Sequence, residues 1–244
     1  MTRRIGLRSP MNRNCTDTAR VVIVKRSPKF FSIFCLVLLT CVGMAAILLG
    51  AQQTDGTPRV VFTKEFPNSQ PDYYSVIVYE NGRATYKSAP DNKSPVEFQL
   101  PSETAAEIFQ LAGKLNWFKD RKIESGRRVA NMGKKTFAFA KGEELSEASF
   151  NHTEIPEAVE LASMFEKISQ TNEHLLRLKN MIRFDRLGVV KELLRIEADL
   201  DAGRLLGAGQ LLPILEQIQK DRSLVNVAKE RAVQILGKIQ TGKD

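Results

Sequence analysis

The spacing of hydrophobic residues changes several times along this chain. From Phe30 to Ala51 there are 22 consecutive residues without a charged side chain. Between residues 59 and 100 apolar and polar residues alternate with a period of two, as in half-buried strands. Beyond residue 101 the period is close to 3.6, apart from a second alternating stretch at 134–151. The chain therefore divides into an apolar segment, a strand-rich part and a helical part.

The apolar segment is long enough to cross a membrane. As a helix, its 22 residues measure about 33 Å, against about 30 Å for the hydrocarbon core of a bilayer. A cleaved signal peptide has a shorter apolar region and small residues before the cut. Cleavage after Ala51 puts Leu49 at the −3 position, whereas cleavage after Ala45 puts Gly43 there. We expect a retained transmembrane signal-anchor at 30–51, and the alternative is a signal peptide whose removal releases a secreted body.

The charge of the chain supports this topology. Residues 1–51 hold eight Lys or Arg and one acid, whereas residues 52–244 hold 28 bases and 27 acids. The basic tail at 1–29 is therefore expected to be disordered and to stay in the cytoplasm, with the body on the extracytoplasmic side. The nearly neutral body gives no case for nucleic-acid binding.

The alternating stretches predict an antiparallel sheet. Strands are expected at 59–66, within 73–88 and at 96–100, and Asn81-Gly82 predicts a type I′ turn in the middle of the second stretch. The two faces of the first strand of this hairpin are Tyr74, Val76, Val78 and Glu80, and Tyr73, Ser75, Ile77 and Tyr79. A second hairpin is expected at 134–151, with its turn at 141–144.

Helices are predicted wherever the 3.6-residue period holds. One begins at Pro101 or Ser102, with Ser102 as its N-cap, and another begins at Pro156. The apolar stripe of the first helix is Ala105, Ile108, Phe109, Ala112 and Leu115, and Trp117 and Phe118 are expected to close over the sheet. Asp185 is a candidate cap for a later helix that Gly203 ends, and two more helices are expected in 208–240.

The order of elements, β-ββ-β-α-ββ-α, contains hairpins and no βαβ unit. We therefore expect the α+β class, with an antiparallel sheet that carries helices on one face and is followed by a C-terminal helical segment. The expected divisions are a tail at 1–29, an anchor at 30–51, an α+β domain at 52–171 and a helical segment at 172–244.

Two parts of the chain resemble known families. Residues 73–170 resemble a domain of unknown function found in exported bacterial proteins, on the pattern of "VIVYENGRATY", "FQLPSETAAEIFQLAGKLNWF" and "IPEAVELASMFEKI". This resemblance implies an α+β domain of the bacterial envelope and carries no catalytic residues. Residues 208–240 resemble a single HEAT-type helical pair, with Pro213 early in the first helix and Asp221 after it; a plain helical hairpin is the alternative.

The sequence predicts no catalytic, cofactor-binding or metal-binding residues. No cysteine follows residue 51, so disulfides and Cys-ligated zinc are excluded from the body. The two histidines, His152 and His174, have no evident third ligand and are expected at the surface. Ser146 and Ser149 lie near His152 in sequence, but the G-x-S-x-G motif of many hydrolases is absent.

Charged residues of opposite sign follow one another in two blocks. Residues 114–141 hold nine bases and two acids, and residues 142–166 hold seven acids and no base. One hypothesis is that Arg127, Arg128, Lys134 and Lys135 contact an anionic lipid or envelope polymer. The alternative is that the two blocks pair with each other or are solvated.

These patterns lead to a functional hypothesis. We expect a single-pass, membrane-anchored extracytoplasmic binding or structural module without a cofactor or catalytic activity. Its expected partners are the membrane, through 30–51, and an envelope protein, anionic lipid or polymer, with no nucleic acid. The alternative is a hydrolase-like envelope enzyme whose site is assembled from residues distant in sequence. A pocket that gathers His152 with acids would favour the enzyme, and a groove without such a cluster would favour the module.

Overall fold

The computed structural model describes residues 56–242. The expected cytoplasmic tail and membrane anchor, at 1–29 and 30–51, lie outside these residues. Residues 54–244 form one compact unit. Within 56–242, no helix combines the length and the apolar character that crossing a membrane requires.

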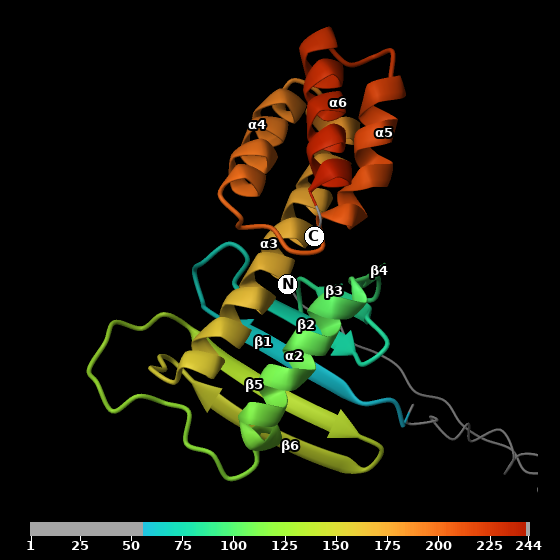
Figure 1. Ribbon diagram of the computed structural model, residues 1–244. Coiled ribbons are helices and arrows are strands. Elements are labelled where there is room, and N and C mark those ends of the chain that lie inside the picture. The colour runs from blue at the N-terminus through green and yellow to red at the C-terminus, as the bar shows by residue number, and fades with distance from the viewer. Residues whose placement is uncertain (1–55, 243–244) are drawn as a thin grey trace, which may run out of the picture. The chain divides into compact units, whose positions relative to one another are not determined.

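The strand-rich part is a single six-stranded antiparallel sheet (Figure 1). Its strands are β1 (Arg59–Glu65), β2 (Tyr73–Tyr79), β3 (Arg83–Lys87), β4 (Val96–Gln99), β5 (Lys134–Lys141) and β6 (Glu144–Phe150). Their spatial order is β4-β3-β2-β1-β5-β6, so β1 is central and β4 and β6 are the edges. The expected strands, the second hairpin and the α+β class are confirmed.

One face of the sheet carries the first hydrophobic core. The helices α2 (Ser102–Lys114) and α3 (Pro156–Phe184) cover this face (Figure 1). The strand residues that face them are the alternate apolar positions, which include Val60, Phe62, Tyr74, Val76, Val78, Phe137 and Phe139. The alternating pattern therefore identified a buried face of β2 correctly, because Tyr74, Val76 and Val78 are buried.

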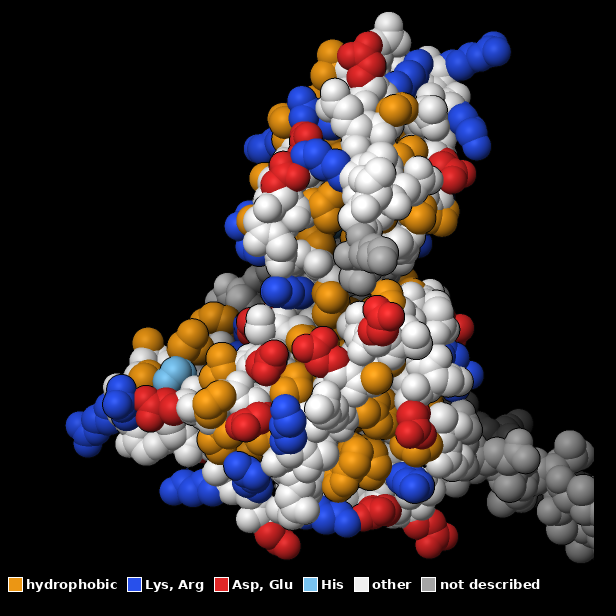
Figure 2. Space-filling view, in the orientation of Figure 1, with side chains coloured by type: hydrophobic (Ala, Val, Ile, Leu, Met, Phe, Trp, Pro, Cys, Tyr) orange, Lys and Arg blue, Asp and Glu red, His pale blue; other side chains and the backbone are white. Residues whose placement is uncertain are grey.

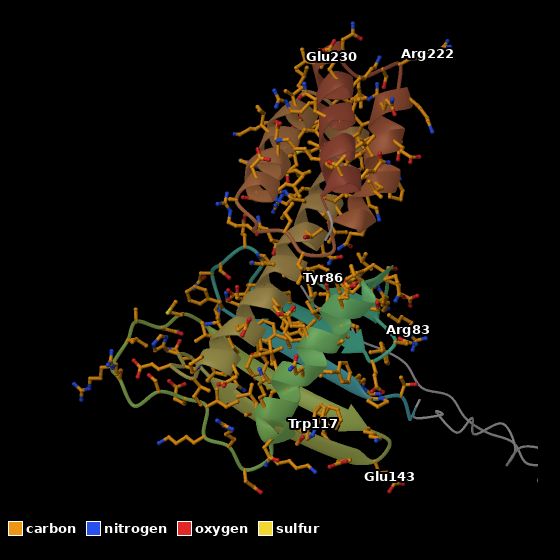
Figure 3. All side chains as sticks on the ribbon, viewed as in Figure 1. Arg83, Tyr86, Trp117, Glu143, Arg222 and Glu230 are labelled. Atoms are coloured by element: carbon orange, nitrogen blue, oxygen red, sulfur yellow. The ribbon has the colours of Figure 1, made fainter. Side chains whose placement is uncertain are left out.

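The end of α2 closes the core as expected. A short 3-10 turn, η1 (Asn116–Phe118), follows the helix and turns its aromatic residues toward the sheet. Phe118 stacks on Phe137 with ring centroids 5.2 Å apart, and Trp117 packs on Phe139 at 4.5 Å. Figure 3 shows Trp117 between α2 and the sheet. All five residues of the predicted α2 stripe are buried.

Two local predictions were wrong. The β2–β3 connection is not a type I′ turn, because only Gly82 has a positive φ, of 81°. The Gly82 N–H donates to the Tyr79 carbonyl at 2.9 Å, so the connection is a longer turn that ends with a left-handed glycine. Ser102 is not an N-cap either. It is already the first residue of α2, and Pro101 precedes the helix without a side-chain cap.

The C-terminal part is a set of antiparallel helices around a second core (Figure 1). After α3 come α4 (Gly188–Asp201), the 3-10 turn η2 (Ala208–Leu211), α5 (Leu212–Lys220) and α6 (Asn226–Thr241). Asp185 is not the N-cap of α4, which is Leu187, but its Oδ1 accepts the N–H of Gly188, the first residue of that helix, at 3.0 Å. The 29-residue helix α3 runs through the expected division at residue 171. The two cores still separate near that point, because Ile168 belongs to the first and Leu175 to the second.

Candidate functional site

A groove of about 490 Å³ lies between the edge strand β4 and the helix α5. Its β4 side is lined by Val96, Glu97, Phe98 and Gln99, and its helical side by Leu175, Lys179, Gly209, Gln210, Pro213, Ile214 and Gln217. The sheet and the helical part meet here, because Val96 packs against both hydrophobic cores. The groove therefore combines a strand edge with a helical wall.

Along β4, the backbone N–H and C=O groups of successive residues point alternately to the neighbouring strand β3 and to the groove. The Leu100 N–H donates to the Gly82 carbonyl at 2.9 Å, and Phe98 is paired with Ala84 two positions along the same ladder. In an antiparallel pair every second residue bonds to the neighbouring strand. The N–H and C=O groups of Phe98 therefore point to β3, whereas those of Glu97 and Gln99 point outward. No strand of residues 56–242 pairs with that outer edge.

The opposite side of the groove holds a buried polar side chain without a partner. Both amide atoms of Gln210, Oε1 and Nε2, are buried and make no hydrogen bond within the part of the chain that the structure describes. Gln210 lies in η2, which follows the left-handed residue Gly207. A buried amide without a hydrogen bond costs about 1–3 kcal/mol. One residue of the groove lining thus carries a buried donor and acceptor that the described chain leaves unused.

Apolar side chains form much of the remaining wall. Val96 and Phe98 are half-buried, and Leu175 and Ile214 are buried. Two exposed charges of opposite sign, Glu97 and Lys179, stand at its margin. Mixed apolar walls with a few convergent polar groups are typical of binding sites. The arrangement can bind an extended chain, but it contains no nucleophile paired with a base.

A larger hollow, of about 790 Å³, lies on the face of the sheet that the helices leave open. The hydroxyls that line it bond to their neighbours on adjacent strands: Thr63 donates to Ser75 at 3.4 Å, and Thr136 and Ser149 lie 2.8 Å apart. Its charged groups, which include Glu65, Lys134 and Glu147, are of both signs. Because its hydroxyls bond to one another and its charges are of both signs, the hollow defines a ligand less well than the groove does.

The four basic residues of the sequence hypothesis do not form one surface. Arg127 and Arg128 are exposed in the loop before β5, and Lys134 is exposed on the open face of the sheet. Lys135 points to the opposite face, where it is buried and its Nζ donates to the Asn151 carbonyl at 3.2 Å. Burial lowers the pKa of the Lys135 ammonium, against the attraction of Glu166.

The acidic and basic blocks are partly paired. The Arg127 guanidinium lies 3.0 Å from a carboxylate oxygen of Glu154, and Lys119 forms an ion pair with Glu144. Figure 2 shows the same mixture, with Asp and Glu side chains distributed among Lys and Arg over the visible face of the sheet part. These contacts favour pairing between the two blocks for Arg127 and Lys119, although they do not involve Arg128 or Lys134.

The structure also corrects the expected position of one histidine. His152 is half-buried, but His174 is only 1% exposed and lies between α3 and α4. Its Nδ1 is 2.7 Å from Glu192 Oε1, and its Nε2 is 2.8 Å from Asp199 Oδ2. Each ring nitrogen therefore has a carboxylate oxygen as its neighbour. The polar neighbours of His174 in sequence suggested a solvated helix face, whereas α4 covers this face with its own acids.

Charged residues around His174 complete a buried network. Burial raises the pKa of Glu192, but hydrogen bonds from His174 and Arg177 outweigh it and lower the pKa to about 2. The pKa of Asp199 is also lowered: burial opposes this, and hydrogen bonds from His174 and Arg204 prevail. The sequence held a signal for this network, because Glu192 lies within the apolar stripe of Val189, Leu193 and Ile196. Most of these contacts join α3 to α4, so the network fastens the two helices together.

The remaining histidine lines a small pocket of about 220 Å³. Lys135, Ser163 and Glu166 share this pocket with His152. Within residues 56–242 the His152 ring makes no hydrogen bond to any of them, and Glu166 is held by Lys64 at 2.9 Å. The described residues also contain no cluster of three or more His, Cys, Asp or Glu side chains that could hold a metal ion. The pocket therefore lacks the base–nucleophile contact that the enzyme hypothesis needs.

Comparison with known proteins adds no family to this description. No protein-family model matches the chain, and no curated protein matches it. The geometry of the groove is therefore the basis for the function proposed below.

Proposed function

We propose that this protein is a non-catalytic binding module that takes an extended peptide segment into the groove between β4 and α5. In this proposal residues 30–51 anchor the chain in the membrane and the body lies on the extracytoplasmic side. The bound peptide is a segment of another envelope protein. The observation that carries the proposal is the unpaired outer edge of β4, which lines the groove together with Gln210, a residue whose buried amide has no partner within residues 56–242.

A peptide strand matches the chemistry of both walls. Peptides that add to a sheet edge gain main-chain hydrogen bonds, and pockets for alternate side chains give specificity. The outward N–H and C=O groups of Glu97 and Gln99 can form up to four such bonds. The Gln210 amide offers one more donor and acceptor to the other side of the same peptide. Apolar side chains of the peptide would pack between Val96 and Ile214.

The size of the site indicates a moderate affinity. Main-chain hydrogen bonds contribute about 0.5–1.5 kcal/mol each, and one buried apolar side chain contributes about 1.5–3 kcal/mol. Against this stands the cost of association and of ordering the peptide, which is several kcal/mol. We therefore expect dissociation constants in the micromolar to millimolar range, as suits a reversible contact between tethered proteins.

A displayed library of random peptides, selected against fragment 54–244, tests the proposal. This fragment is suitable because it is the compact unit and both hydrophobic cores lie within it. Selected peptides should bind in calorimetric titrations, and both Glu97→Pro and Gln210→Leu should weaken them at least tenfold. Gln219→Leu is the matched control, because Gln219 is exposed on α5 and does not line the groove.

Two outcomes would contradict the proposal. One is a selection that yields no peptide above background. The other is a set of peptides whose affinity is the same for wild type, Glu97→Pro and Gln210→Leu. In either case the outer edge of β4 would not be a binding site.

A further inference from the structure

The turn between α3 and α4 exposes two large apolar side chains. Phe184 and Leu187 are each 80% exposed, more than any other large apolar side chain in residues 56–242. Only two residues, Asp185 and Arg186, separate them in sequence. The neighbouring turn, between α5 and α6, adds the half-exposed side chains of Val225 and Val227. Single exposed apolar residues are common, but a group at one end of a helical bundle is not.

The two turns lie at the same end of the helical part. Asp221, which precedes the α5–α6 turn, has a pKa lowered mainly by hydrogen bonds from Ser223 and also by the positive charges of Arg186 and Lys229. Arg186 from the first turn is thus close to Asp221 in the second. Figure 3 shows Arg222 and Glu230 at this end, where α5 stops and α6 begins. We call the residues of these two turns, 183–187 and 221–227, the helical tip.

Basic side chains surround the apolar ones. The bases of the helical tip and its first flanking turns are Lys179, Arg183, Arg186, Lys191, Lys220, Arg222, Lys229 and Arg231, against the acids Asp185, Asp221 and Glu230. Two of these acids are occupied locally, since Asp185 accepts the Gly188 N–H and Asp221 accepts from Ser223. The Arg183 guanidinium lies 5.7 Å from the centre of the Phe184 ring. The helical tip thus exposes apolar side chains that are surrounded by positively charged ones.

We propose that the helical tip docks on the surface of an anionic lipid bilayer, with Phe184 and Leu187 inserted at the level of the headgroups. Surface-bound segments with this composition bury their apolar residues at the boundary of headgroups and acyl chains. Lys and Arg near the surface add attraction to anionic lipids. This contact is separate from the expected anchor at 30–51, and it stands or falls independently of peptide binding at β4.

The shape of the helical tip favours a bilayer over a protein partner. A stable protein interface buries about 800 Å² on each side, whereas an aromatic side chain such as Phe184 provides only about 150–250 Å². Phe184 and Leu187 project from a tight turn, and the pocket that Phe184 borders is too small to hold a complementary chain. The adjoining pocket of about 210 Å³ is lined by polar residues as well, among them Arg177, Asn180 and Asp185.

Sedimentation with lipid vesicles tests the proposal on fragment 54–244, which lacks the expected anchor. The vesicles are pure phosphatidylcholine, or phosphatidylcholine with about one third phosphatidylserine. We expect binding to the anionic vesicles that weakens at high salt, as screening requires. The double variant Phe184→Ser, Leu187→Ser should bind roughly 100-fold more weakly. Leu145→Ser is the matched control, because Leu145 is 70% exposed on β6 and lies outside the helical tip.

Thermal unfolding of the three proteins shows whether each is folded, and analytical ultracentrifugation reports their mass. Equal binding of wild type and the double variant would overturn the proposal. So would equal binding to neutral and anionic vesicles. A wild-type fragment that is dimeric, and that becomes monomeric in the double variant without binding vesicles, would assign the helical tip to a second copy of the chain instead.

Discussion

His174 on α3 and Glu192 on α4 form a buried contact in which the ring Nδ1 lies 2.7 Å from the carboxylate Oε1. Neither side chain has meaningful contact with solvent, because their side chains are 1% and 0% exposed. Arg177 and Arg195 approach the same carboxylate at 2.7 and 3.2 Å. The α3–α4 interface therefore depends on an ionic network within a core that is otherwise apolar.

Removal of the His174 ring should destabilise the helical part. The variant His174→Asn leaves Glu192 buried with one partner fewer, and the loss of a hydrogen bond to a charged group costs about 1.5–3 kcal/mol. Urea unfolding followed by circular dichroism measures the loss. His152→Asn is the matched control, with an expected change within about 0.5 kcal/mol, because the His152 ring makes no hydrogen bond in the described part of the chain. Equal stability of the two variants would show that the network contributes nothing to the fold.

The same network should make stability depend on pH below neutrality. Glu192 has a pKa of about 2 in the folded chain, against an ordinary value of 4.5. A lowered pKa means that the carboxylate contributes stability above pH 4.5, and that this contribution is lost as the pH falls toward 2. The loss amounts to at most about 3 kcal/mol.

Urea unfolding between pH 7 and pH 2 measures this effect. The control variant Glu192→Gln should be less stable at pH 7 and should show a flatter dependence below pH 4.5. A wild-type curve that is parallel to that of Glu192→Gln would exclude Glu192 as the source of the acid sensitivity.

The position of the membrane anchor is a prediction that rests on the sequence alone. If residues 30–51 are retained, mass spectrometry of the membrane fraction should find peptides from the segment before Phe30. If the segment is cleaved, the mature chain should begin near Gln52 and the protein should be found in the soluble extracytoplasmic fraction. The two results are mutually exclusive for the bulk of the protein, so one experiment decides between anchor and signal peptide.

Local patterns predicted the sheet and the helices because burial on one face repeats with a fixed period. The alternation of Tyr74, Val76 and Val78 and the stripe through Ala105 and Ile108 required no knowledge of the tertiary structure. The Gly82 turn was mistaken because Asn81-Gly82 is compatible with more than one loop length. Only the pairing of Val78 with Ala84 shows which loop is present.

The groove could not be predicted in the same way. It depends on which strand lies at the edge of the sheet and on how η2 places Gln210 opposite that strand, 111 residues after Gln99 in the chain. His174 was misjudged for a related reason. Its polar sequence neighbours indicated solvent, but its carboxylate partners come from a different helix. In both places the decisive partner is remote in sequence, and no local period reports it.

Proline substitutions in β4 should separate the outer edge from the inner one. Glu97→Pro removes an N–H that points away from the sheet, so its cost should be within about 1 kcal/mol, as for prolines on edge strands. Phe98→Pro removes an N–H that bonds to β3 and should cost about 3 kcal/mol or more. Thermal unfolding of the two variants measures the difference. The reverse order of stability would show that the outward assignment of Glu97 and Gln99 is wrong.

Gln210→Leu should make the unliganded protein more stable while it weakens peptide binding. In the free protein the buried amide has no hydrogen-bond partner among residues 56–242, and an apolar side chain of similar size removes a cost of about 1–3 kcal/mol. A residue kept only for packing would show the opposite effect, because its replacement would lower stability and leave binding unchanged. Thermal unfolding and peptide titration of the same sample measure both quantities. A gain in stability together with a loss of affinity would mean that the Gln210 amide serves ligand binding. A loss of stability would mean that Gln210 serves to stabilise the fold.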